Sequence, residues 1–357
     1  MSGLVRARRT ARRALSSPFA LLTALCSSLF ALRMLGGGLI GMSDQGDGHR
    51  LLCQLGLRQG NGYDTSTRDW FHPLWYDHTW YGEDCGAVGE PYRSTQLVVA
   101  WVATRLTHAL TGLDGLDLRF VALLSSVLVG ALIAAIAVLA ARRWVTRVLL
   151  AGALFVTTAD GAFAGYFASA SSEPGSFTGL LALTAAVLAL LRTPRVRVHH
   201  LLLVTAATAL LIGAKTQNAT VLAAVVPLLL LRPLASRRPG AAPGSSGSQL
   251  LRRLPALGLA VALVAGSGAY LHAQPDRFTT QNDYAAVFIE MLPHSPDPVG
   301  DLRALDLPVA MAESSGIAIG APGSAANSLD FVGFSERAGL TRRVLVYLQA
   351  PPSACGR

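Results

Sequence analysis

Two aspartates lie three positions apart at the start of the first long polar segment. Asp44 and Asp47 occur in Gly-Met-Ser-Asp-Gln-Gly-Asp at 41–47, directly after an apolar run. Partial desolvation at a membrane–water boundary raises the pKa of a carboxyl group, which suits it to act as a general base. Two carboxylates can also hold a divalent cation. The structural alternative is that Asp47 caps a helix over 48–57 and that Asp44 is only solvated.

A single lysine stands out among the 30 basic residues. Lys215 and Gln217 lie in Lys-Thr-Gln-Asn at 215–218, a turn that interrupts a long apolar stretch. An ammonium group at that depth can neutralise a phosphate. The alternative is a lysine that only extends its charged head to the interface. Arg33, near the end of the first apolar run, has the same two interpretations, with the interfacial one favoured.

Glu173 precedes Pro174 at the end of a short polar segment over 160–174. Proline suits the first turn of a helix, so a helix start is the structural interpretation of this pair. A carboxylate at the edge of an apolar run is costly to desolvate, which favours a functional role. Both interpretations stay open for Glu173.

The polar segment 36–117 is rich in aromatic residues and contains two cysteines. Four of the five tryptophans lie between positions 70 and 101. Trp and Tyr favour the headgroup level of a membrane, and their faces also stack on sugar rings, so a belt and a binding platform are both open. Cys53 and Cys85 predict a disulfide if this segment lies outside the cytoplasm.

The composition restricts the class of protein. The 357 residues are 52% hydrophobic and 14% charged, with a mean hydropathy of +0.43, whereas soluble domains carry about 25% charged residues. This excludes a cytosolic enzyme, a disordered chain and a disulfide-rich secreted scaffold. The predicted fold class is all-α, a polytopic membrane helical bundle of about seven spans. The predicted spans are 17–35, 118–141, 147–159, 175–191, 200–214, 219–231 and 254–273.

The arginines predict the orientation of these spans. Sixteen of them fall before residue 16 or in the segments 142–147, 192–197 and 232–253, which none of the 21 acidic residues shares. Cytoplasmic loops collect Arg, so the N-terminus is expected in the cytoplasm and the acidic loops outside. The net charge of +9 therefore comes from arginines that flank the membrane spans. It gives no reason to expect a nucleic-acid partner. If 94–112 crossed the membrane, every later arginine-rich segment would lie outside. These residues are therefore expected to form a helix in the outer interface rather than a span.

The predicted organisation has three parts. A basic cytoplasmic tail over 1–16 precedes a transmembrane bundle over 17–273, which includes the outer loop 36–117 and a cytoplasmic linker over 232–253. The linker is rich in Gly, Ser and Pro, as flexible linkers are. An extracytoplasmic segment over 274–357 follows. Its last apolar stretch stops at Pro-Pro, which raises the hypothesis of a truncated chain.

These features together resemble the C-type glycosyltransferases, multi-span membrane enzymes that use polyprenyl-phosphate sugars. The resemblance rests on a basic tail and one span, Ser-Asp-Gln-Gly-Asp at 43–47, the acid–proline step at 172–174 and the basic–amide turn at 215–218. Within this superfamily the chain is similar to actinobacterial membrane proteins of the glycan hexose transferase type. The resemblance implies transfer of a hexose from a polyprenyl-phosphate donor to an extracytoplasmic glycan or cell-envelope acceptor.

The resemblance also implies residue roles. Asp44, with Asp47 as the second choice, would act as general base on the acceptor hydroxyl. The other candidates would bind substrate, with the basic groups stabilising the departing phosphate and the acid positioning the acceptor or a divalent cation. These substrate-binding candidates are Glu173, Lys215, Gln217, Arg50 and Arg33.

Two other classes of function stay open at this point. A flippase or transporter for lipid-linked sugars would also need a cationic cavity, but it would need polar groups in the cytoplasmic half of the spans, which are nearly bare there. A non-catalytic or truncated membrane protein is the third class. The expected partners are a polyprenyl-phosphate sugar and membrane lipid, and the sequence names no protein partner.

Overall fold

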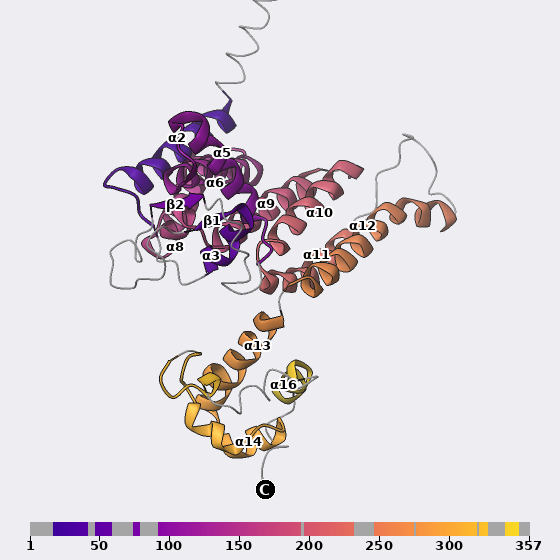
Figure 1. The fold of residues 1–357 in the computed structure, drawn as a ribbon. Helices are drawn as coiled ribbons and strands as arrows, with labels where there is room; N and C mark the ends of the chain where they lie inside the picture. The colour runs from indigo at the N-terminus through magenta and orange to yellow at the C-terminus, as the bar shows by residue number, and fades with distance from the viewer. Residues whose placement is uncertain are drawn as a thin grey trace, which may run out of the picture. The chain divides into compact units, whose positions relative to one another are not determined.

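The computed structural model describes residues 17–41, 47–58, 74–78, 92–193, 196–231, 246–274, 276–319, 321–327 and 340–349. They belong to two compact units, Met1–Ala273 and Gln274–Arg357. Their regular structure is almost entirely helical (Figure 1). Together with the apolar helices of the first unit, this confirms the predicted helical membrane bundle.

Each apolar run that predicted a span coincides with a helix of the first unit. Among the described residues, four helices are long and apolar enough to cross a membrane, and a bent pair adds a fifth. The four are α2 (Pro18–Leu35), α6 (Leu118–Ala140), α9 (Glu173–Arg192) and the stretch Arg253–His272 of α12 (Ser246–His272). In the pair, α7 (Trp144–Thr158) is bent by 66° from the short helices that follow it, α8 (Gly161–Ala164) and η3 (Gly165–Ala168).

Two shorter apolar helical segments complete the bundle. They are α10 (Val198–Ile212) and the continuous pair η4 (Thr216–Val221) and α11 (Leu222–Leu231). Short helices suit a membrane protein where they line a space enclosed by protein. The helices are observed, whereas their seven crossings and the orientation of the chain stay predictions.

Helices α2 and α6 pack tightly against each other. Leu22, Cys26, Phe30 and Met34 recur every four residues on α2 and are buried, as expected for one face of a helix. Gly130 of α6 faces α2 so closely that an added Cβ would lie 2.8 Å from the Cα of Ser27. Small residues allow this approach of backbones in membrane bundles.

The described part of the first loop combines short helices with a small sheet. It contains α3 (Asp47–Leu52), η1 (Cys53–Leu55), β1 (Leu57–Arg58), β2 (Trp75–His78), α5 (Gln96–Thr111) and β3 (Gly115–Asp117). The strands pair antiparallel in the order β1-β2-β3, with Tyr76 opposite Leu116. The predicted helix at 94–112 corresponds to α5, which packs on α6 and β3. The three-stranded sheet was not predicted.

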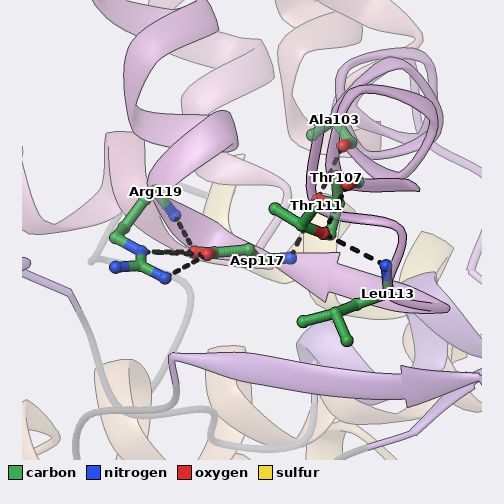
Figure 2. Close-up of polar contacts among 6 residues, drawn as sticks. All are labelled: Ala103, Thr107, Thr111, Leu113, Asp117 and Arg119. Carbon is green, nitrogen blue, oxygen red and sulfur yellow. Dashed lines mark hydrogen bonds and ion pairs between the residues drawn. The ribbon is translucent and has the colours of Figure 1, made fainter. Parts of the chain in front are cut away.

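Asp117 joins the end of α5 to the start of α6 (Figure 2). Its carboxylate accepts hydrogen bonds from the backbone N–H of Arg119 at 2.8 Å and from the Arg119 guanidinium at 2.6 Å to 3.0 Å. This caps the N-terminus of α6. The backbone N–H of Asp117 donates to Thr107 Oγ1 at 3.2 Å. Because Asp117 is buried, these contacts fix the C-terminal half of α5 against α6.

The second unit is a separate helical cluster. Its elements are α13 (Asp276–Tyr284), the π-helix η5 (Ala285–Met291), η6 (Leu292–His294), α14 (Pro298–Ala304), η7 (Val309–Ser314), η8 (Ala325–Asn327) and α16 (Leu340–Gln349). Tyr284 and Phe288 stack in its core. The hydroxyl of Tyr347 donates to the buried Asp301, which ties α16 to α14.

The contact at Gly130 gives a stability prediction. Gly130→Ala should lower the free energy of unfolding by about 1–3 kcal/mol, because the new methyl group forces α2 away from α6. Gly152→Ala on α7 is the matched control, since an added Cβ there meets nothing within 4 Å. Its stability should be unchanged or slightly raised. Detergent-induced unfolding of the purified protein measures both, and equal stability of the two variants would refute the close packing.

Candidate functional site

A lysine–glutamate pair joins two helix ends that lie 42 residues apart in the sequence. Lys215 follows the C-terminal end of α10, and Glu173 is the first residue of α9. The Lys215 Nζ donates a hydrogen bond to Glu173 Oε1. Their side chains are only 27% and 22% exposed. Both charges are thus largely removed from water, and each needs the other as a partner.

The turn that carries Lys215 lies directly beside the first turn of α9. Asn218 Nδ2 donates to Ser176 Oγ and to the carbonyl of Leu211, both at 2.8 Å. A Cβ at Gly175 would lie 3.0 Å from the Cβ of Ala214. The absence of a side chain at position 175 therefore allows the two segments to approach.

A third segment, residues 92–96, docks on the same turn. Ser94 Oγ donates to the carbonyl of Ala214 at 2.8 Å. The N–H of Thr95 donates to the carbonyl of Gly213 at 2.8 Å. The last carbonyls of a helix have no partner within the helix, and the Thr95 hydroxyl donates to one of those of α10, the carbonyl of Leu210, at 3.0 Å. We call residues 92–96, 172–176 and 213–218 together the polar junction.

Tyr92 links the polar junction to α3. Its phenol donates to the carbonyl of Ala214 at 3.3 Å. Its backbone N–H donates to the carbonyl of Arg50 at 3.3 Å, and its carbonyl accepts from Gln54 Nε2 at 2.7 Å. Burial raises the pKa of the Tyr92 phenol, and the charge of Lys215 opposes this only in part. The phenol therefore stays protonated at neutral pH and acts as a donor.

The arrangement at the polar junction suits an anionic ligand. The Lys215 ammonium lies where α9 begins, and a helix N-terminus also favours negative charge through its dipole and its unpaired N–H groups. The Glu173 carboxylate now occupies this favourable position. A phosphate that binds to Lys215 would have to displace that carboxylate, which would then be available to a hydroxyl or a cation.

The match to known families decides what kind of protein contains this junction. A family model for the YfdI N-terminal transmembrane domain matches residues 6–318. The chain belongs to the YfdI N-terminal transmembrane domain family. It is therefore a membrane protein, and the match covers the whole polar junction. Comparisons with curated proteins and with solved structures found no match.

In this YfdI-family chain the sequence-predicted binding residues occupy different surroundings. Glu173 and Lys215 are in contact, as described above. Gln217 is exposed on η4, two residues after Lys215. Arg50 lies on α3, and its backbone carbonyl accepts a hydrogen bond from the N–H of Tyr92. Arg33 belongs to the last turn of α2, where its Nε donates to the carbonyl of Ala159 at 3.2 Å.

The predicted catalytic acids lie at the border of the described residues. Asp44 lies outside them. Asp47 is the first residue of α3, which with η1 ends at Leu55 and is therefore shorter than the helix expected over 48–57; the side chain of Asp47 lies outside the described ones. Gly41, three residues before Asp44 in the sequence, lies close to Ala168 of η3, because a Cβ added at Gly41 would lie 3.8 Å from the Ala168 carbonyl oxygen. Their role as general base stays a prediction.

The cysteines of this YfdI-family chain differ in state. Cys53 is disulfide-bonded, whereas Cys26 is a free thiol buried in α2. Cys85 lies outside the described residues, so its pairing with Cys53 stays a prediction. Within the described ranges, no group of three or more His, Cys, Asp and Glu residues could hold a metal ion.

Sequence reasoning missed several residues that build the polar junction. Tyr92, Ser94 and Thr95 act through hydrogen bonds to backbone carbonyls, which leave no pattern in a sequence. Tyr270 of α12 also contributes, since its hydroxyl donates to the carbonyl of Arg93 at 3.0 Å. A usable signal was the cluster Tyr-Arg-Ser-Thr at 92–95, a polar run just before the apolar stretch of α5.

The ion pair of this YfdI-family chain predicts strongly non-additive effects on stability. Lys215→Met and Glu173→Gln should each lower the free energy of unfolding by about 1–3 kcal/mol, because each leaves a polar or charged partner poorly solvated. The double variant should lose less than the sum of the two. Unfolding of the purified protein in detergent measures this cycle. Glu290→Gln, an exposed acid of the second unit, is the control, and strictly additive losses would contradict the coupling.

Proposed function

We propose that this chain is a membrane glycosyltransferase that moves a hexose from a polyprenyl-phosphate donor to an extracytoplasmic glycan or cell-envelope acceptor. The observation that carries the proposal is the meeting of Lys215 and Glu173 at the polar junction. Three distant segments build this junction inside a transmembrane domain, and Tyr92 ties it to α3 through the carbonyl of Arg50. A membrane-spanning structure needs no such partly buried charge pair, so a functional use explains it better.

The proposed reaction follows from the groups present. The acceptor hydroxyl oxygen attacks the anomeric carbon of the donor sugar, and the bond from that carbon to the phosphate oxygen breaks with its electron pair on the oxygen. Asp44, or in second place Asp47, takes the hydroxyl proton. Lys215 binds the phosphate and stabilises the charge that develops as polyprenyl phosphate leaves.

The remaining candidates support this step. Glu173, displaced from Lys215 by the phosphate, positions the acceptor or a divalent cation. Arg50 is the better placed of the two arginines to assist the phosphate, because its helix is bound to the polar junction through Tyr92. Arg33 donates to the end of α7 and stays the weaker candidate. Gln217 lines the exposed side of the Lys215 turn.

The proposed location follows from the arginines. The basic tail lies in the cytoplasm, and the first long loop and the segment after 274 lie on the extracytoplasmic side of the membrane. The donor then reaches the polar junction from the outer leaflet. Polyprenyl-phosphate sugar and membrane lipid are the proposed partners.

Activity of variants tests the proposal. Transfer of labelled hexose from a polyprenyl-phosphate donor, measured in membranes, should fall about 10²–10⁴-fold in Asp44→Asn, which loses the base. It should fall about 10²–10³-fold in Lys215→Met, which loses a donor to the leaving phosphate. Lys215→Arg should retain more activity than Lys215→Met because the charge persists.

Asp160→Asn is the matched acid control. Asp160 is exposed and caps α8 by accepting from the N–H of Ala162 at 2.9 Å, a role that asparagine also fills. Its transfer activity should equal that of the wild type. Undiminished transfer in Asp44→Asn would remove the assignment of the base. Movement of the lipid-linked sugar between leaflets without any transfer would identify a flippase instead.

A further inference from the structure

A partly open pocket of about 270 Å³ lies around the C-terminal half of α5, away from the polar junction. The wall of the pocket is made by η1, the end of β2, α5 and the start of β3. Its polar and aromatic lining residues are His78, Trp101, Thr104, Arg105, His108 and Asp114. None of them has a role in the proposed transfer step.

Local structure brings these side chains together. Trp101, Arg105 and His108 follow the i, i+4, i+7 spacing and so lie on one face of α5. Gly112, with φ of 72°, ends the helix in the left-handed conformation. The chain then turns back, and Asp114 Oδ1 lies 2.9 Å from His108 Nδ1. The Arg105 guanidinium carbon lies 5.7 Å from the centre of the Trp101 ring.

The chemistry of this lining suits a neutral polyol. The guanidinium and the imidazoles can donate hydrogen bonds, the Asp114 carboxylate accepts them, and the Thr104 hydroxyl can do both. Trp101 is half exposed and offers an apolar ring. A phosphate or an anionic lipid headgroup would have to displace the Asp114 carboxylate from His108, whereas a neutral hydroxyl can donate to that carboxylate where it stands. Adjacent sugar hydroxyls, by contrast, need donors and acceptors side by side.

We propose that this pocket binds one hexose unit of the acceptor glycan; this inference rests on the proposed function. The N-terminal end of α5 adjoins the polar junction, because a Cβ at Gly175 would lie 3.6 Å from the Cβ of Gln96. His108 lies twelve residues further along the helix, or about 18 Å at 1.5 Å per residue. The pocket therefore holds a sugar unit remote from the reacting end and selects acceptors long enough to reach both places.

Direct binding tests the pocket without requiring transfer. Methyl hexosides of gluco, galacto and manno configuration, and linear tetrasaccharides of the same hexoses, are titrated into the purified full-length protein and followed by calorimetry and saturation-transfer NMR. At least one hexose should bind saturably. Trp101→Ala and Asp114→Asn should weaken its binding about tenfold or more.

Trp144→Ala is the matched control, since Trp144 is an equally exposed tryptophan on α7 and lies outside the pocket. It should bind like the wild type, and thermal unfolding should be the same for all three variants. Absence of saturable binding to the wild type, or unchanged affinity in Trp101→Ala, would overturn the proposal. The same holds if the pocket variants change only the retention of phosphatidylglycerol in nanodiscs, because the ligand would then be a lipid.

Steady-state transfer separates this inference from the proposed function. Trp101→Ala should raise the KM for a tetrasaccharide acceptor about tenfold and leave kcat and the donor KM unchanged. A short acceptor should show no such effect. If hexoside binding persists but no variant or wild type transfers sugar, the proposed function fails and the binding pocket stands. If transfer occurs and the KM for long acceptors does not change, only the pocket assignment fails.

Discussion

The ion pair between Lys215 and Glu173 depends on how helix ends meet in the bundle. A carboxylate is stabilised at the N-terminus of a helix and a cation at the C-terminus, and Glu173 and Lys215 occupy those ends of α9 and α10. Neighbouring antiparallel helices place such ends side by side. Their close approach requires Gly179, where an added Cβ would lie 2.7 Å from the Cα of Leu211. The site and the packing of α9 on α10 therefore depend on each other.

Much of the architecture could be predicted because apolar length is a strong signal in a membrane protein. The helices at 18–35, 118–140 and 173–192 follow from uninterrupted apolar runs with polar ends. Lys215 and Glu173 stand out in the sequence because charged groups are costly at the edge of such runs. The sequence could not show that they touch each other, since the direction in which helix ends face depends on tertiary packing.

Other parts had little or no signal in the sequence. The sheet depends on β1, which has two residues, and on pairings between residues 19 or more positions apart, such as Arg58 with Asp77. The docking of residues 92–96 uses backbone carbonyls as acceptors, which every sequence possesses. The pocket on α5 arises only because Gly112 adopts a left-handed turn and returns Asp114 to the helix. Such features depend on geometry that composition and periodicity do not encode.

Helix α5 connects the two sites as a rigid spacer, because both of its ends are fixed. Residues 94 and 95 donate hydrogen bonds to the carbonyls of Ala214 and Gly213, directly after α10, and the Thr107 hydroxyl accepts one from the N–H of Asp117 at the start of α6. A helix held in this way cannot change its length or slide. The distance from the polar junction to the pocket is therefore set by the number of residues between them. If the pocket holds a sugar unit, the length of α5 sets the minimum length of the acceptor. The specificity for acceptor length then resides in helix geometry rather than in the reacting groups.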